Sequence, residues 1–138
     1  MDDYFALSLP PAQLDGLSAL ALAHMGDAVY ELLVRAWLCT HGKLRSRDLH
    51  GAAVLRVSAT AQARAAARIA PLLTQGEAAV FRRGRNAHTH AAPPSAGPAQ
   101  YHAATGLETL FGWLFLSGAR DRINTLFRAI IEGSDDAS

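Results

Sequence analysis

The chain has 138 residues, and half of them are hydrophobic. This is enough for one domain over residues 1–138 to form a hydrophobic core without disulfide or metal cross-links. Its one cysteine excludes an internal disulfide framework and a cysteine-based zinc cluster, and no segment reaches the roughly 18 uncharged apolar residues of a membrane span. The formal net charge of +1 conceals a basic middle third, with nine basic and two acidic residues from Lys43 to Arg85, typical of a polyanion-binding surface or of a merely solvated face.

Sparse β-branched residues and abundant alanine predict an all-α fold, whose first long helix we expect over residues 17–39. Its core side on a helical wheel holds six residues: Leu22, Met25, Val29, Leu32, Leu33 and Ala36. Its other side holds His24, Asp27, Glu31 and Arg35. We expect Gly42 to end this helix as a left-handed cap. We expect the thiol of Cys39 to be packed rather than reactive, and a single cysteine is typical of a cytoplasmic protein.

Three further helices are expected in the middle of the chain. A short one near 46–52 precedes an alanine-rich helix over about 53–69, which stops at Pro71. Thr74 is a good N-cap for a helix over about 75–85, because Glu77 stands at the capping-box position.

Residues 86–99 contain three prolines and few apolar side chains, so we expect a flexible loop, in which the pair His88 and His90 is more typical of solvated residues than of a metal site. Helices resume over about 100–117 and 119–132. The first places Leu107, Leu110, Phe111 and Leu114 toward the core, with Thr105 and Glu108 off it. The core therefore spans about 17–132, and the tail 133–138 is expected to be frayed.

Two carboxylates lie within about a helical turn of a glycine in otherwise apolar helices: Asp27 after Gly26, and Glu108 before Gly112. Phosphodiester hydrolysis with Mg²⁺ needs such hard oxygen ligands, and the glycines would let the two backbones approach. The alternative is that Asp27 is a surface acid and Glu108 pairs with an arginine. Motifs for a serine nucleophile, a phosphate loop or a His-Glu-x-x-His zinc site do not occur, so neither nucleophilic catalysis nor a nucleotide cofactor is expected.

Several motifs in order carry a resemblance to a known family. They are Met25-Gly26-Asp27-Ala28-Val29-Tyr30-Glu31, Leu49-His50, Val57-Ser58-Ala59, Ala61-Gln62-Ala63, Arg83-Gly84-Arg85-Asn86-Ala87, and Ala104-Thr105-Gly106-Leu107-Glu108-Thr109-Leu110-Phe111-Gly112. From about residue 17 to 132 the chain resembles Mini-ribonuclease III, a short relative of ribonuclease III without a separate double-stranded-RNA-binding domain.

The resemblance implies an all-helical ribonuclease III-type domain of about six to seven helices that works as a homodimer in the cytoplasm. It implies that Asp27 and Glu108 are catalytic and bind Mg²⁺, for which Mn²⁺ would substitute. Cleavage of double-stranded RNA in the large-subunit (23S) ribosomal RNA precursor is then expected, leaving 5′-phosphate ends. Leu20, Ala23 and Thr105 stand where full-length ribonuclease III has carboxylates, so the resemblance implies either one firmly held ion or a second ion that the substrate phosphate recruits. Glu31 and Thr105 are candidates for residues that do not bind the ion themselves but orient the side chains that do.

Candidate RNA contacts lie in the basic region, because A-form RNA is gripped through phosphates and 2′-hydroxyls. The guanidinium groups of Arg83 and Arg85 suit phosphate, with Asn86 beside them. Further candidates are Ser58, Gln62, Arg64 and His50, where a structural role is an open alternative for Ser58, Gln62 and His50. Two rival functions remain: a non-catalytic double-stranded-RNA-binding module, and an interaction protein whose basic face meets an acidic partner.

Overall fold

The computed structural model describes residues 2–42, 45–87 and 97–136, and of residues 134–136 it describes only the backbone. Within these ranges the chain forms helices and no strand, which confirms the predicted all-α fold. The helices are α1 (Pro11–Asp15), α2 (Ala19–His41), α3 (Ser46–Val57), α4 (Ala59–Ile69), the short 3-10 helix η1 (Ala70–Leu72), α5 (Gln75–Arg85), α6 (Pro98–Leu116) and α7 (Arg120–Asp136). No helix in the described ranges combines the length and the hydropathy that crossing a membrane requires.

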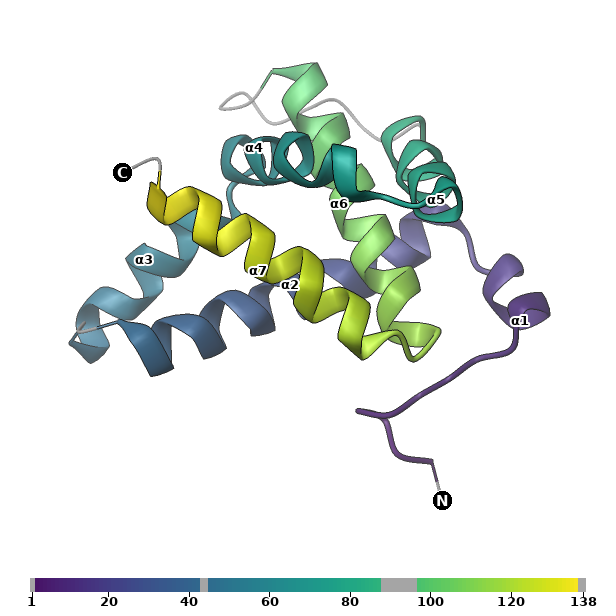
Figure 1. Ribbon diagram of the computed structural model, residues 1–138, viewed down its shortest axis with the longest axis horizontal. Coiled ribbons are helices and arrows are strands. Elements are labelled where there is room, and N and C mark those ends of the chain that lie inside the picture. Colours follow the sequence, from purple (N-terminus) through teal and green to yellow (C-terminus); the bar gives the residue numbers. More distant parts are fainter. Residues whose placement is uncertain (1, 43–44, 88–96, 137–138) are drawn as a thin grey trace.

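Helix α6 is the centre of the fold, and α2, α4, α5 and α7 all pack against it (Figure 1). Glu108 is the one Asp, Glu, Lys or Arg residue among its 19 positions, and the middle of the helix, from Ala104 to Gly112, is buried by its neighbours except at Glu108, which is half-buried. Leu107, Leu110, Phe111 and Leu114 are buried, as predicted. Glu108 is therefore carried into the middle of the molecule by the helix that the other helices surround.

The core is organised around Tyr30 of α2. Its ring meets Phe111 of α6 and Phe127 of α7 edge to face, with centroid distances of 5.4 Å and 6.0 Å. Burial raises the pKa of Tyr30 to about 12, although Arg56 opposes the shift. The predicted core side of α2 was wrong at two positions: Leu32 is 52% exposed and Ala36 is exposed.

The buried stripe of α2 instead follows Leu22, Gly26, Tyr30, Val34 and Leu38. Each is four residues from the next, so all five lie along one face. The closest approach of α2 to α6 is made through Gly26, which a hydrophobicity pattern does not weight.

The join between α3 and α4 differs from the predicted boundary near residue 52. Helix α3 runs to Val57, and Ser58 then takes an extended conformation (φ −61°, ψ 157°). The Ser58 hydroxyl accepts a hydrogen bond from the backbone N–H of Ala61 at 3.2 Å, so it caps α4. Helix α5, by contrast, has the predicted bounds, because Thr74 and Glu77 form the predicted capping box.

The left-handed turn is made by a different glycine from the one predicted. Gly42 is extended, with φ −78°, whereas Gly118 has φ +81°. At Gly118 the N–H groups of residues 118 and 119 bond to the carbonyls of Phe115 and Leu114, which closes α6 with a Schellman motif. The cap belongs to the short turn between α6 and α7, where the chain must reverse at once.

Three more predictions concern the C-terminal tail, Cys39 and the long loop. The tail was predicted to fray from residue 133, but α7 continues to Asp136, and Gly133 lies against the guanidinium of Arg68. Cys39 is exposed rather than packed, because it faces away from the α2 stripe. In the predicted flexible loop 86–99, α6 already begins at Pro98; residues 88–96, with His88 and His90, lie outside the described residues, as do 137 and 138.

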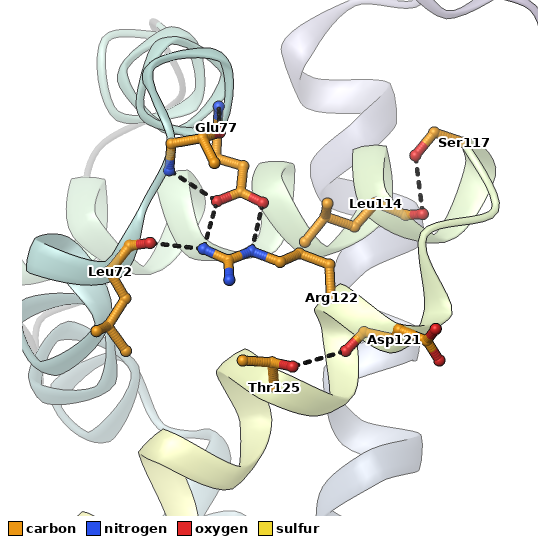
Figure 2. A network of polar contacts seen from close by, with 8 residues as sticks. Leu72, Glu77, Leu114, Ser117, Asp121, Arg122 and Thr125 are labelled. Atoms are coloured by element: carbon orange, nitrogen blue, oxygen red, sulfur yellow. Dashed lines mark hydrogen bonds and ion pairs between the residues drawn. The ribbon is translucent and has the colours of Figure 1, made fainter.

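A compact polar network ties α5 to α7 (Figure 2). Glu77 is only 5% exposed, and its two carboxylate oxygens accept hydrogen bonds from Arg122 Nε at 2.7 Å and Arg122 Nη2 at 2.9 Å. The same Nη2 donates to the carbonyl of Leu72, and Glu77 also accepts from the backbone N–H of Thr74. Burial favours the neutral acid, but the bonds from Arg122 and Thr74 outweigh it and hold the pKa of Glu77 below its usual value.

Candidate active site

The two glycines predicted to allow a close helix approach do so. A Cβ atom on Gly26 would overlap the carbonyl oxygen of Glu108, and one on Gly112 would overlap the carbonyl oxygen of Leu22. The backbones of α2 and α6 are therefore in direct contact at this crossing, with no room for a side chain between them. Asp27 follows one of these glycines, and Glu108 lies opposite it.

Asp27 and Glu108 meet at the crossing. Asp27 is exposed on α2, Glu108 is half-buried on α6, and their side chains are hydrogen-bonded to each other. Burial is the largest cause that raises the pKa of Glu108 to about 8, and the hydrogen bond and negative charge of Asp27 raise it further. Two acids 81 positions apart in sequence thus lie together at the helix crossing, and within the described part of the chain the neighbour that shifts the pKa of Glu108 upward is Asp27.

Gln62 of α4 is the third side chain at this point. It is 3% exposed, and it lies near enough to Glu108 to oppose the rise in the pKa of that carboxyl group. The sequence left open whether Gln62 contacts RNA or is structural. Its burial favours the structural alternative, since a side chain without exposed surface cannot reach a duplex.

The two candidates for supporting the ligands lie in different surroundings. Glu31, one turn beyond Asp27, forms an ion pair with Arg35 at 2.6 Å on the exposed face of α2. Thr105, predicted to lie off the core, is instead buried, and its hydroxyl donates to the carbonyl of Tyr101 at 3.1 Å. A short hydroxyl side chain can be buried in a helix because it bonds the preceding turn, which a wheel diagram does not take into account.

Arg83, Arg85 and Asn86 are exposed at the C-terminal end of α5. Arg83 donates to the carbonyl of Leu17, just before α2, at 3.3 Å. Gly84 between the arginines lies against the side chain of Thr109 in α6, one residue from Glu108. The basic end of α5 is therefore anchored to both helices that carry the acids.

The remaining candidates are exposed on neighbouring helices. Arg64 belongs to α4, Ser58 directly precedes that helix, and His50 belongs to α3; all three side chains have accessible surface. Ser58 already has a structural role as the cap of α4, and an exposed capping hydroxyl keeps spare hydrogen-bonding capacity.

Sequence reasoning missed Thr109. It is fully buried, and its hydroxyl bonds to the carbonyls of Thr105 at 2.7 Å and Ala19 at 3.3 Å, which ties α6 to the start of α2. The signal was present in the motif Gly106-Leu107-Glu108-Thr109. A threonine in an otherwise apolar helix indicates a buried hydroxyl group that is hydrogen-bonded within the fold.

Comparison with known proteins agrees with this geometry. The Ribonuclease III domain family matches residues 20–119, which include all of α2 except its first residue, all of α6, and both acids. Mini-ribonuclease 3 of Symbiobacterium thermophilum is 46% identical over 123 residues, covering 89% of this chain and 88% of that protein. Mini-ribonuclease 3 of Synechocystis sp. is 44% identical over 133 residues, covering 94% and 90%.

A solved structure has the same fold. The crystal structure of protein FN1578 from Fusobacterium nucleatum superposes with a TM-score of 0.79 at 26% identity, covering 88% of this chain and 98% of that one. The family match covers the sequence motifs described above, and the superposition shows that the same helical fold occurs in a solved structure. The chain therefore belongs to the ribonuclease III family, in its Mini-ribonuclease 3 branch, and is an endoribonuclease.

Proposed function

We propose that this endoribonuclease hydrolyses double-stranded RNA with a divalent cation, Mg²⁺ by preference and Mn²⁺ as a substitute, held by Asp27 and Glu108. The observation that carries the proposal is the direct contact of these two carboxyl groups at the α2–α6 crossing. Paired acids of this kind are costly to assemble unless a cation or a proton lies between them.

The donor set fits a hard cation that retains much of its water. Both donors are carboxylate oxygens, the ligands that Mg²⁺ prefers, and Asp27 is open to solvent. Among the described residues no three His, Cys, Asp or Glu side chains gather into a fuller metal-binding group. Two protein carboxylates leave positions for water and for a substrate phosphate, which matches a site where RNA completes the coordination.

A bound Mg²⁺ supplies Lewis acidity toward the phosphate and makes water easier to deprotonate, which hydrolysis of a phosphodiester requires. Glu108, with a pKa of about 8, holds a proton near neutral pH and must release it to act as a ligand. Asp27 provides the exposed path by which that proton reaches solvent. Activity should therefore rise with pH through the neutral range.

The basic end of α5 would hold the strand beside the acids. Arg83, Arg85 and Asn86 are exposed there, and guanidinium groups bind phosphate oxygens in a bidentate manner. Arg64, Ser58 and His50 offer further donors on α4 and α3. Such contacts read the shape of an A-form duplex rather than its base sequence.

The natural substrate in this proposal is the precursor of large-subunit (23S) ribosomal RNA in the cytoplasm, cut to leave 5′-phosphate and 3′-hydroxyl ends. The proposed active form is a homodimer, since a duplex presents two strands to two sites. Exposed apolar side chains support this: Leu32 of α2 is 52% exposed, and Val54 and Leu55 of α3 are 47% and 76% exposed.

The decisive test is Asp27→Asn. Removing one of two cation ligands should lower Mg²⁺-dependent cleavage of duplex RNA about 10³-fold, since the cation contributes several kcal/mol to the transition state. Circular dichroism and duplex binding without Mg²⁺ should stay close to wild type, because Asp27 is exposed. Cleavage at an undiminished rate would remove Asp27 from the mechanism, and unchanged wild-type cleavage in a chelator would remove the cation.

The phosphate-binding role is tested by the double variant Arg83→Ala/Arg85→Ala. Each lost phosphate contact should reduce the slope of log affinity against log salt by about 1, so the double variant should lose about 2. The matched control is Arg120→Ala/Arg128→Ala on α7, which removes the same charge from two exposed positions and should leave the slope unchanged. Equal slopes in both double variants would separate the basic end of α5 from RNA binding.

A further inference from the structure

Gln62 is a buried carboxamide beside the paired acids. It lies on α4, which packs against α6, and it is 3% exposed. A leucine of similar size at such a position would lose no hydrogen bonds, whereas a buried carboxamide must find partners for two donors and an acceptor. What the side chain contacts therefore decides what it does.

The donor side of Gln62 is anchored: Nε2 donates to the carbonyl of Val57 at 2.9 Å. The same carboxamide lies near enough to Glu108 to lower the pKa of that carboxyl group, against the effect of burial. The Val57 carbonyl is free for this because α3 ends there and Ser58 turns into the cap of α4. The break at Ser58 thus creates an anchor for the carboxamide, and the carboxamide reaches the acid.

The acceptor side of Gln62 is unused. Oε1 is fully buried and has no hydrogen-bond partner among the described residues. A buried acceptor without a partner is costly and uncommon in folded proteins. It is explained if another donor reaches this point when the site is at work.

We propose that Gln62 is a positioning residue: anchored on the Val57 carbonyl, it fixes the orientation of the Glu108 carboxylate toward Asp27 and offers Oε1 to a water that hydrates the bound cation. This rests on the proposed cation site. It adds a third helix, α4, to the two that carry the ligands, and it assigns a purpose to the unpartnered oxygen. Gln62 itself does not touch the reacting atoms.

The first test uses the wild-type protein, labelled with ¹⁵N and titrated with Mg²⁺ alone. The side-chain amide signal of Gln62 should move together with the backbone signals of Asp27 and Glu108. The signal of Gln100, which accepts a hydrogen bond from Thr60 across the same α4–α6 pair, should not move. Movement at Asp27 and Glu108 without movement at Gln62 overturns this inference alone, whereas no movement at all three overturns the cation site as well.

The second test is Gln62→Leu, which keeps the volume and removes the carboxamide. Mg²⁺ affinity without RNA and kcat should each fall about 10-fold or more, as is usual when a group that orients a ligand is lost, while KM for duplex RNA and the melting temperature change little. The control is Thr60→Val, which removes the hydrogen bond from Thr60 of α4 to Gln100 of α6 and should leave all four quantities near wild type. Unchanged Mg²⁺ affinity and kcat in folded Gln62→Leu would contradict the inference; if the variant does not fold, the titration above decides.

Discussion

Glu77 and Glu108 are both shielded acids on central helices, and the fold treats them in opposite ways. Glu77 is enclosed by Arg122 and the start of its own helix, and its pKa lies below the usual value. Glu108 is enclosed by apolar helix and a second acid, and its pKa rises to about 8. Burial pushes both pKa values up, so the difference comes from the partner.

The partner of a buried acid indicates whether that acid serves the stability of the fold or its function. An acid matched by a guanidinium and backbone N–H groups is satisfied in the folded protein and contributes to its stability. An acid placed against another acid is satisfied only by something from outside, a proton or a cation. Exposure alone would have selected Glu77, which is the more buried of the two.

The largest effect is expected from Arg122→Leu, which would leave Glu77 buried without its cation. Loss of one partner of such a pair should cost about 3 kcal/mol of unfolding free energy at pH 7. The pKa of Glu77 is lowered in the folded protein, so the network stabilises above the usual value of 4.5 and loses its effect as pH falls below it. The loss in the variant should therefore shrink at acidic pH.

Urea unfolding of Arg122→Leu at pH 7 and pH 4 measures this change. Arg128→Leu, at an exposed position of the same helix, is the control and should stay within about 0.5 kcal/mol of wild type. An equal loss at both pH values would mean that the side chain of Arg122 acts through packing rather than through its charge.

A smaller effect of opposite sign is expected from Glu108→Gln. The folded protein binds the Glu108 proton more tightly than the unfolded chain does, so wild-type stability should fall as pH rises from 4.5 to about 8. The amide does not carry this cost. In the presence of a chelator the variant should be more stable than wild type at pH 8.5 and nearly equal to it at pH 5. The gain at pH 8.5 should be about 2 kcal/mol, less than the full pKa shift implies, because Glu108 is only half-buried and solvent screens its charge.

Thermal or urea unfolding across this pH range measures the gain. Glu132→Gln, an exposed position on α7, controls for the loss of a negative charge and should not show it. If Glu108→Gln destabilised the protein at pH 8.5, Glu108 would belong with Glu77 as a structural acid.

The smallest effect is the contribution of Asp27 to the pKa of Glu108. Asp27→Asn removes the like charge and should lower that pKa from about 8 by about one unit, while burial keeps it above 4.5. Carboxyl ¹³C shifts followed through a pH titration measure it directly. An unchanged pKa would show that the two acids do not sense each other in solution.

Most of the helical framework could be predicted from local sequence signals. The bounds of α5 follow from Thr74 and Glu77, whose capping interactions involve only neighbours in the chain. Ser58 could not be placed as easily, since a serine in an alanine-rich run is compatible with a continuous helix, and the break depends on where α4 packs. Gly42 and Gly118 are equally plausible caps by sequence, and only the tight reversal between α6 and α7 distinguishes them.

The meeting of Asp27 and Glu108 was within reach of the sequence because each acid stands beside a glycine in an apolar helix. The burial of Gln62 and Thr105 was not, because their polarity predicts exposure and their partners come from the fold. The shifted pKa of Glu108 also depends on which atoms surround it, and no pattern of residue types gives that.

The glycine contact at the α2–α6 crossing has a consequence for how the enzyme should respond to heat. Because main chain rests on main chain there, the spacing of the two acids is set by the rigid axes of two helices, not by adjustable side chains. Increased motion of core side chains on heating should therefore not change the distance between Asp27 and Glu108 until α2 and α6 separate. Catalytic competence should consequently persist undiminished to the melting point and then vanish in the same cooperative step as the fold.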